Sequence, residues 1–231
     1  EAARRQKLAA LGRLTANLAH EIRNPLSAIG HAAQLLGEDA ASREQARLTG
    51  IIGNNVHRLN NLVEEVLTLN RRDRTEPKRI GAAQLAELTR ELGEAEDIPP
   101  SAIRLALDGT AEFLFDPEHL RQIIWNLLRN AWRASSKMPG CLRLVLDEGA
   151  GGVRLALIDD GPGVRPEHRD RLFEPFFTTE AQGTGLGLFL ARELAEANAA
   201  NLEFVPGDAG AQFVLTMRKE RGDAPDYPAG R

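Results

Sequence analysis

The chain has 231 residues, 42% of them hydrophobic and 27% charged, with a formal net charge of −4 at pH 7. This length allows one large domain or two modest ones, and the acidic balance excludes the basic surface of a typical nucleic-acid-binding protein. The single cysteine, Cys141, excludes an intramolecular disulfide framework. No apolar run in the chain reaches the roughly 18 residues that span a bilayer.

The first third of the chain predicts two long helices that pack against each other. Apolar or small residues alternate spacings of three and four, the pattern of a coiled-coil seam. The first seam is Leu8, Leu11, Thr15, Leu18, Ile22, Pro25, Ile29, Ala32 and Leu36, and the second is Leu48, Ile52, Asn55, Leu59, Leu62, Val66 and Leu69. Residues 37–42 predict a turn with Ser42 as helix cap. Two helices leave apolar surface uncovered, so we expect a homodimer with a four-helix bundle.

A different pattern follows a charged segment that contains Pro77. It predicts helices over residues 82–92, 117–136 and 185–197, and strands over 103–107, 112–115, 142–146, 153–158, 202–205 and 212–217. This mixture indicates an α+β sandwich, a mostly antiparallel sheet covered on one face by helices. The predicted domains are therefore residues 1–73, a linker over 74–80, and residues 81–219, followed by a disordered tail over 220–231.

The first candidate site is residues 20–26, His-Glu-Ile-Arg-Asn-Pro-Leu. With Ile22 in the seam, His20 falls on the outward face of the helix and Asn24 lies one turn later. His20 has the chemistry of a nucleophile, Glu21 that of its proton acceptor, and Asn24 that of a residue that orients a water molecule. A solvated histidine on a polar helix face remains the alternative.

A second group lies on the predicted helix over residues 117–136. Asn126 and Asn130 are four residues apart and share one helix face among apolar neighbours. Their amide oxygens suit Mg²⁺, and Arg133, one turn further along, is placed for phosphate. The alternative is that buried amides hydrogen-bond to the sheet.

Three further groups follow in the second half of the chain. Asp159, Gly161 and Gly163 end an apolar strand, where a carboxylate suits the exocyclic amine of adenine; a plain turn is the alternative. Phe173 and Thr179 bound the run Phe-Glu-Pro-Phe-Phe-Thr-Thr, whose aromatics would equally serve as core. A glycine-rich loop opens a helix, and its backbone N–H groups suit a polyphosphate; it comprises Gly183, Thr184, Gly185, Leu186 and Gly187.

The order of these groups resembles that of sensor histidine kinases. Residues 20–26 match the phospho-acceptor box, 126–133 the N box, 159–163 the Asp-x-Gly-x-Gly box, 173–179 the F box and 183–188 the glycine loop. The resemblance covers about residues 8–217. It implies a dimerisation and histidine-transfer hairpin followed by an ATPase domain of the Bergerat (GHKL) type. It also implies that Asn130 is the principal Mg²⁺ ligand, with Asn126 a possible second one, and that Asp159 rather than Asp160 contacts adenine.

That resemblance implies an activity and partners. ATP with Mg²⁺ would phosphorylate His20, and an aspartate of a response-regulator receiver domain would take the phosphoryl group, with phosphatase activity toward that regulator. Residues 27–36 and Glu76-Pro77 resemble sensor kinases of type IV pilus regulation, whose regulators act with sigma factor 54. Because the chain starts at Glu1 inside a helical pattern, we expect a cytoplasmic fragment of an inner-membrane-anchored protein.

Three other classes of protein share parts of this pattern, and one residue differs from the pattern of the family. A degenerate scaffold would lack intact boxes, while a clamp ATPase of the gyrase and chaperone type, or a serine kinase of the anti-sigma-factor type, has no use for residues 20–26. Relatives often carry lysine after the Phe-Phe-Thr-Thr run, where this chain has Glu180. A carboxylate there would repel the triphosphate.

Overall fold

The computed structural model describes residues 22, 24–36, 42–72, 74–149, 152–180, 183–207 and 210–217. The chain divides into two compact units, with the division between Asn70 and Arg71. One unit contains the helical hairpin together with Arg171–Phe189, and the other contains Arg71–Asp170 and the chain from Leu190 onward. Among the described residues, no helix is both long enough and apolar enough to cross a membrane.

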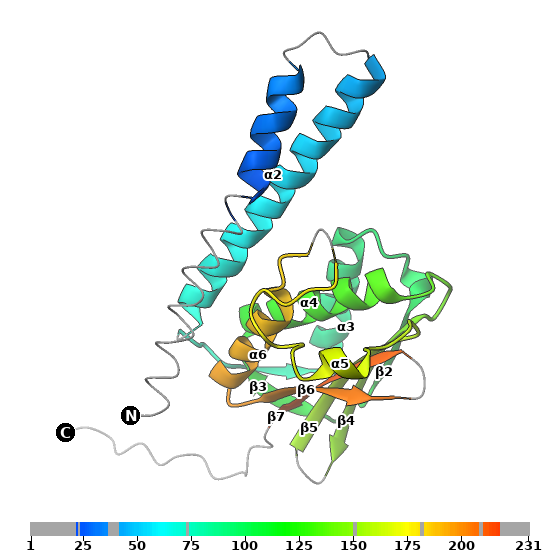
Figure 1. Cartoon of the computed structure of the whole chain (residues 1–231). Coiled ribbons are helices and arrows are strands. Elements are labelled where there is room, and N and C mark those ends of the chain that lie inside the picture. Colours follow the sequence, from blue (N-terminus) through cyan, green and yellow to red (C-terminus); the bar gives the residue numbers. More distant parts are fainter. Residues whose placement is uncertain are drawn as a thin grey trace, which may run out of the picture. The chain divides into compact units, whose positions relative to one another are not determined.

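The hairpin consists of the helical residues 24–36 and the long helix α2, Ser42–Arg71, which run side by side in Figure 1. Helix α2 begins at Ser42, where the sequence predicted a cap, and carries Glu44 in its first turn, where a negative charge favours the helix dipole. Residues 37–41 of the predicted turn over 37–42, and the first seam up to Leu18, lie outside the described residues.

Both predicted seams face inward wherever the structure describes them. On the first helix Pro25 and Ala32 are buried, and on α2 Leu48 and Leu62 are buried, while the remaining described seam residues are half-buried. The described residues leave a second set of apolar side chains on α2 exposed: Val56, Val63 and Leu67 are 42–49% exposed. The coiled-coil pattern therefore predicted the packed face correctly, and an apolar stripe remains on another face.

The second unit is built on a five-stranded sheet with the order β2-β4-β5-β7-β6. Its strands are β2 Ile103–Leu107, β4 Leu142–Gly149, β5 Gly152–Asp159, β6 Asn201–Pro206 and β7 Ala211–Met217. Strands β2 and β4 pair in parallel, and the other three pairings are antiparallel. The predicted sheet is confirmed as mostly antiparallel.

A separate two-stranded sheet joins β1, Lys78–Gly81, to β3, Glu112–Phe115. The sequence predicted the chain of β1 as part of a linker and placed β3 in the main sheet. Instead, Ile80 pairs with Phe113 across this small antiparallel ladder, and both side chains are buried. A short helix α5, Pro166–Arg169, was also not predicted.

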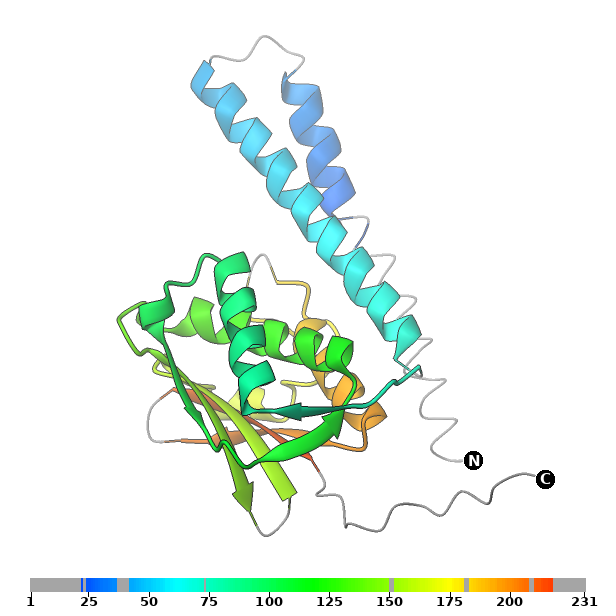
Figure 2. The same cartoon turned by 180° about the vertical axis from the view of Figure 1, so that it is seen from behind.

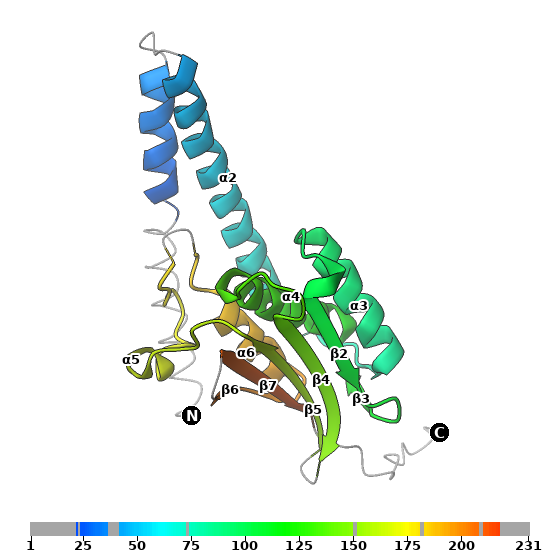
Figure 3. The same ribbon diagram turned by 90° about the vertical axis from the view of Figure 1, so that its right-hand side faces the viewer.

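Helices α3, Ala82–Ala95, α4, Pro117–Ala134, and α6, Gly187–Ala197, lie on the same face of the sheet (Figures 2 and 3). Helix α4 is strongly amphipathic, and its apolar stripe faces the strands. The stripe is buried and comprises Leu120, Ile123, Ile124, Leu127 and Leu128. This packing fixes the rotation of α4 and thereby the direction of its polar residues.

Candidate functional site

The hairpin carries the described part of the first candidate box. His20 and Glu21 lie outside the described residues, so their orientation stays a prediction. Ile22 is half-buried, Pro25 is buried and Asn24 is exposed. Asn24 therefore lies on the outward face of this helix, where the sequence predicted it.

Helix α4 begins at a well-formed cap and carries the second group. The Asp116 carboxylate Oδ1 accepts hydrogen bonds from the backbone N–H groups of Glu118 and His119, at 2.9 and 3.1 Å, and Pro117 fills the first helical position. The helix then runs without a break through Asn126 and Asn130 to Ala134. The predicted phosphate and metal residues therefore share one rigid element.

Asn126 is the most informative of these side chains. It is 1% exposed, and neither its Oδ1 nor its Nδ2 has a hydrogen-bond partner among the described residues. The alternative that buried amides bond to the sheet is therefore wrong for Asn126. Leaving a buried polar group unpaired costs about 1–3 kcal/mol, which a folded protein tolerates where a ligand supplies the partner. Asn130 is half-buried and Arg133 is exposed one turn further along.

Asp159 ends β5 and has the geometry of a fixed acceptor. The side chain is 5% exposed, and its Oδ1 accepts the N–H groups of Gly161 and Ala211, at 2.9 and 3.1 Å. The structure gives Oδ2 no partner among the described residues, so this oxygen keeps its capacity to accept. Burial raises the pKa of Asp159, while the two N–H donors oppose that rise.

The neighbouring carboxylate, Asp160, has a different role. Its oxygens accept the N–H group of Ser136, at 2.9 Å, and the Ser136 hydroxyl, at 2.6 Å. These bonds lower the pKa of Asp160 and tie the end of β5 to the segment after α4. Both oxygens of this exposed carboxylate are therefore engaged in a local structural contact, unlike those of Asp159.

Sequence reasoning missed the turn that holds Asp159. Gly210 has φ +73°, and a Cβ added there would lie 1.7 Å from the Asp159 backbone oxygen. Only glycine fits this position, and it brings the next N–H group, that of Ala211, onto Asp159. Gly163 packs against the same turn, since an added Cβ would lie 2.8 Å from the Gly210 oxygen. A glycine directly before a strand was the available signal.

The remaining predicted residues belong to the unit that contains the hairpin. Helix α6 begins at Gly187, directly after the glycine loop, so the loop lies at a helix N-terminus as predicted. Gly185 has φ +71°, and an added Cβ would lie 2.4 Å from the Phe176 carbonyl carbon. The Gly185 oxygen accepts the Phe176 N–H group at 2.9 Å. The Phe-Phe-Thr-Thr run and the glycine loop are thus joined at their bases.

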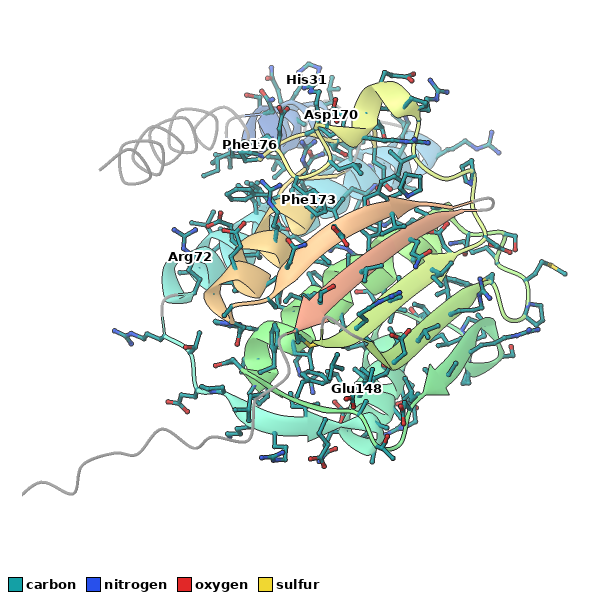
Figure 4. All side chains as sticks on the ribbon, turned by 90° about the horizontal axis from the view of Figure 1, so that it is seen from below. His31, Arg72, Glu148, Asp170, Phe173 and Phe176 are labelled. Carbon is teal, nitrogen blue, oxygen red and sulfur yellow. The ribbon has the colours of Figure 1, made fainter. Side chains whose placement is uncertain are left out.

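The aromatic residues of this segment are not a buried core. Phe173 and Phe176, both labelled in Figure 4, and Phe177 are half-buried, while Thr179 is exposed. Phe176 packs against a small apolar cluster formed by Leu62, Leu186 and Phe189, together with Ile22. Thr184 is buried, and its Oγ1 accepts the N–H group of Leu186 at 3.3 Å. The loop is therefore held in shape by its own hydrogen bonds.

Comparisons with known proteins match the chain in two parts. The family model of the His Kinase A (phospho-acceptor) domain matches residues 10–75. The model of the histidine kinase-, DNA gyrase B- and HSP90-like ATPase matches residues 115–221. Together the two models account for the order of the candidate groups along this chain.

Two curated relatives span nearly the whole chain. The sensor protein kinase PilS of Pseudomonas aeruginosa is 43% identical over 95% of this chain and 43% of the relative. The sensor histidine kinase ZraS of Escherichia coli K12 is 33% identical over 94% of this chain and 47% of the relative. The chain thus spans less than half the length of these relatives.

Two solved structures share the fold. The histidine kinase ThkA, in complex with response regulator protein TrrA, has a TM-score of 0.75 and 27% identity, and covers 94% of this chain and 64% of its own. The histidine kinase AdeS of Acinetobacter baumannii has a TM-score of 0.68 and 22% identity, with 86% and 97% covered.

Proposed function

Because this chain belongs to the sensor histidine kinases of two-component systems, we propose that it phosphorylates His20 from ATP and passes the phosphoryl group to a response-regulator aspartate. The protein is a histidine kinase with an ATP-binding domain. The observation that carries the proposed site is Asn126, whose buried amide has no partner among the described residues. A polar side chain held in this way on α4 is best explained by a polar ligand.

Different residues bind the adenine, the metal ion and the phosphates of ATP. Asp159 Oδ2, which has no partner among the described residues, is the acceptor for the exocyclic amine of adenine. Asn130, with Asn126 one turn earlier, holds Mg²⁺, a metal that prefers oxygen ligands and that neutralises charge on the phosphates. Arg133 at the end of α4 and the N–H groups of the loop before α6 bind phosphate oxygens.

The chemical step belongs to the hairpin. A ring nitrogen of His20 attacks the γ-phosphorus of ATP, the bond to the bridging oxygen breaks, and ADP leaves. Glu21 accepts the proton of the other ring nitrogen, so that the phosphorylated imidazole is neutral. Catalysis is then mainly positioning and charge neutralisation, as in other phosphoryl transfers.

One experiment tests the acceptor. His20→Gln should remove label transfer from γ-labelled ATP and leave nucleotide affinity within about twofold, because His20 lies far in sequence from every nucleotide group. The label on the wild-type chain should be stable to alkali and labile to acid. His31→Gln is the matched control, since His31 is exposed on the first helix of the hairpin and should label normally. Acid-labile label that persists on the His20 variant would refute the assignment.

The exposed apolar stripe on α2 supports the proposal of a homodimer. Val56, Val63 and Leu67 are 42–49% exposed, and Leu26 on the first helix is 53% exposed. Covering such side chains is the usual reason for a hairpin to become a four-helix bundle. Light scattering should give twice the chain mass of 25.3 kDa, and Val63→Lys should shift it toward the monomer. A wild-type monomer at micromolar concentration would contradict this.

The regulator and the wider protein complete the proposal. The similarity to PilS supports a role in type IV pilus transcription, through a regulator that acts with sigma factor 54. Exposed Asn24 supports phosphatase activity toward that regulator. Because the relatives are more than twice as long as this chain, we propose that the whole protein adds a sensor and an inner-membrane anchor, with this part in the cytoplasm.

A further inference from the structure

A buried polar cluster lies apart from the residues assigned to nucleotide binding. It comprises Asp116, His119, Asn198 and the backbone N–H group of Glu76. Asp116 and His119 are each 6% exposed. All four belong to the unit that begins at Arg71, and they join the start of α4, the end of α6 and the chain between α2 and β1.

Asp116 uses both carboxylate oxygens. Oδ1 caps α4, and Oδ2 accepts the N–H group of Glu76 at 2.7 Å, from 40 residues earlier in the chain. Burial alone would raise the pKa of Asp116, but N–H donors from Glu76, His119 and Glu118 lower it below its ordinary value. The carboxylate is therefore ionised, and its bond to the Glu76 N–H group is charge-assisted.

Asn198, the residue after α6, bonds to the start of α4. Its Oδ1 accepts the N–H group of Asp116 at 2.9 Å, and its Nδ2 donates to the Leu194 oxygen at 2.8 Å. These two contacts fix the orientation of the amide, so Nδ2 faces His119 Nδ1 at 2.9 Å. That ring nitrogen must accept, which places the His119 proton on Nε2. The start of α4 and the end of α6 are thus fixed to each other.

A second anchor lies four residues before Glu76. Arg72, labelled in Figure 4, forms an ion pair with Glu193 of α6, and the two side chains are only 15% and 19% exposed. Glu193 and Asn198 lie on and just beyond the last two turns of one helix. The chain between residues 72 and 76 is therefore attached to the ATP-binding domain at both ends.

We propose that Asp116 is a positioning residue for phosphoryl transfer, because with Glu193 it clamps residues 72–76 to α4 and α6. The ATP-binding domain then turns about a short hinge at the end of α2, instead of about a free linker over residues 74–80. A short hinge limits the orientations in which the γ-phosphate meets the hairpin. The clamp should therefore affect the transfer rate and leave ATP affinity unchanged; the rate effect rests on the proposed transfer to His20.

Asp116→Ser separates the two tasks of the carboxylate. Serine remains a good helix cap, but its shorter side chain cannot reach the Glu76 N–H group. At saturating ATP, the autophosphorylation rate should fall about tenfold, which is the loss expected from one charge-assisted bond. The dissociation constant for ATP should stay within about twofold of the wild-type value. Asp108→Ser is the matched control, since the exposed Asp108 carboxylate bonds Thr110 in a surface turn. It should change neither quantity.

Hydrogen exchange tests the clamp independently of kinase activity. Pro77 has no N–H group, so a peptide over residues 74–77 reports on the amides of Thr75 and Glu76. Exchange of this peptide should accelerate about tenfold in Asp116→Ser. Faster exchange with an unchanged transfer rate would overturn the positioning role, and unchanged exchange would overturn the clamp. A missing label on wild-type His20 would instead refute the proposed function alone.

A second pair of variants covers the case in which Asp116→Ser does not fold. Glu193→Arg should slow transfer and Arg72→Glu should do the same, whereas the double exchange should restore the rate, because it restores the ion pair with reversed charges. Glu112→Arg is the control, since its partner Arg79 forms an exposed pair at 3.2 Å. Loss of ATP binding in Glu193→Arg, or failure of the double exchange to restore the rate, would overturn the proposal.

Discussion

Replacing Asp159 by asparagine should weaken ATP binding in a way that the local geometry specifies. The N–H groups of Gly161 and Ala211 both point at Oδ1, so an asparagine side chain must keep its oxygen there. Its NH₂ group then occupies the position of Oδ2 and meets the amine of adenine donor to donor. One charge-assisted bond is lost, worth about 1.5–3 kcal/mol, which raises the dissociation constant about 10- to 100-fold.

The fold should not suffer from this change. Burial raises the pKa of Asp159, which means that the folded state disfavours the ionised form relative to the unfolded chain. A neutral amide removes that cost, so the melting temperature should stay equal or rise. Asp160→Asn is the matched control, because Asp160 is exposed and bonds Ser136 instead. It should bind ATP normally.

Calorimetry with two nucleotides makes the test specific. Inosine triphosphate carries a carbonyl oxygen where ATP carries the amine, so it should gain on ATP by at least about tenfold in the Asp159 variant. Burial raises the pKa of Asp159 above the ordinary carboxyl value of about 4. Wild-type affinity for ATP should therefore fall as the pH drops toward this raised pKa, and the variant should lose this dependence. An unchanged ratio of the two affinities would refute the adenine contact.

Three further perturbations address other parts of the chain. Asn24→Ala should slow dephosphorylation of the cognate regulator about 10- to 100-fold and leave autophosphorylation within a few-fold of the wild-type rate, whereas Glu21→Ala should do the reverse. Both rates are measured with the same regulator, and a reversed pattern would contradict these two roles. Glu180→Lys should lower the dissociation constant for ATP about threefold or more at low salt, and less at high salt, because it replaces a charge that repels the triphosphate. The fold should tolerate this change, since Glu180 is exposed and its backbone N–H group keeps its bond to the Thr178 hydroxyl. Equal dissociation constants of variant and wild type at low salt would exclude the charge effect. Asp116→Ala should cost roughly 1–3 kcal/mol in urea unfolding at neutral pH. Since the folded-state pKa of Asp116 is lowered, this cost should be full above the unfolded pKa of about 3.9 and disappear as pH falls through the lower folded value. Both tryptophans lie on α4, so their fluorescence follows this transition, and a cost that persists at low pH would contradict the charge-assisted bonds.

Local pattern predicted most elements of this kinase. Strands β2 and β3 begin and end where alternation and turn residues placed them, and the seams of the hairpin face inward. Strand β1 was missed because Ile80 is the only large apolar residue in it, and its pairing with Phe113 joins residues 33 positions apart. The parallel pairing of β2 with β4 was equally out of reach, because no local signal sets a register between distant strands.

The candidate site was predicted residue by residue, but its supporting contacts were not. Motif order pointed to Asn126 and Asp159, yet only the structure shows that the Asn126 amide has no partner among the described residues and that Gly210 brings the Ala211 N–H group to Asp159. Such contacts depend on tertiary packing, which spacing along the chain does not encode. His20 lies outside the described residues and stays a prediction.

The bond between Phe176 and Gly185 has a consequence for how this chain can vary. It holds the two ends of residues 177–184 together at a base where only glycine fits. A loop whose ends are fixed in this way tolerates insertions and deletions at its tip, since each doubling of its length adds only ~0.6 kcal/mol of closure entropy. Changes in length at the tip of this loop should therefore cost the fold little, whereas any side chain at position 185 would clash with Phe176.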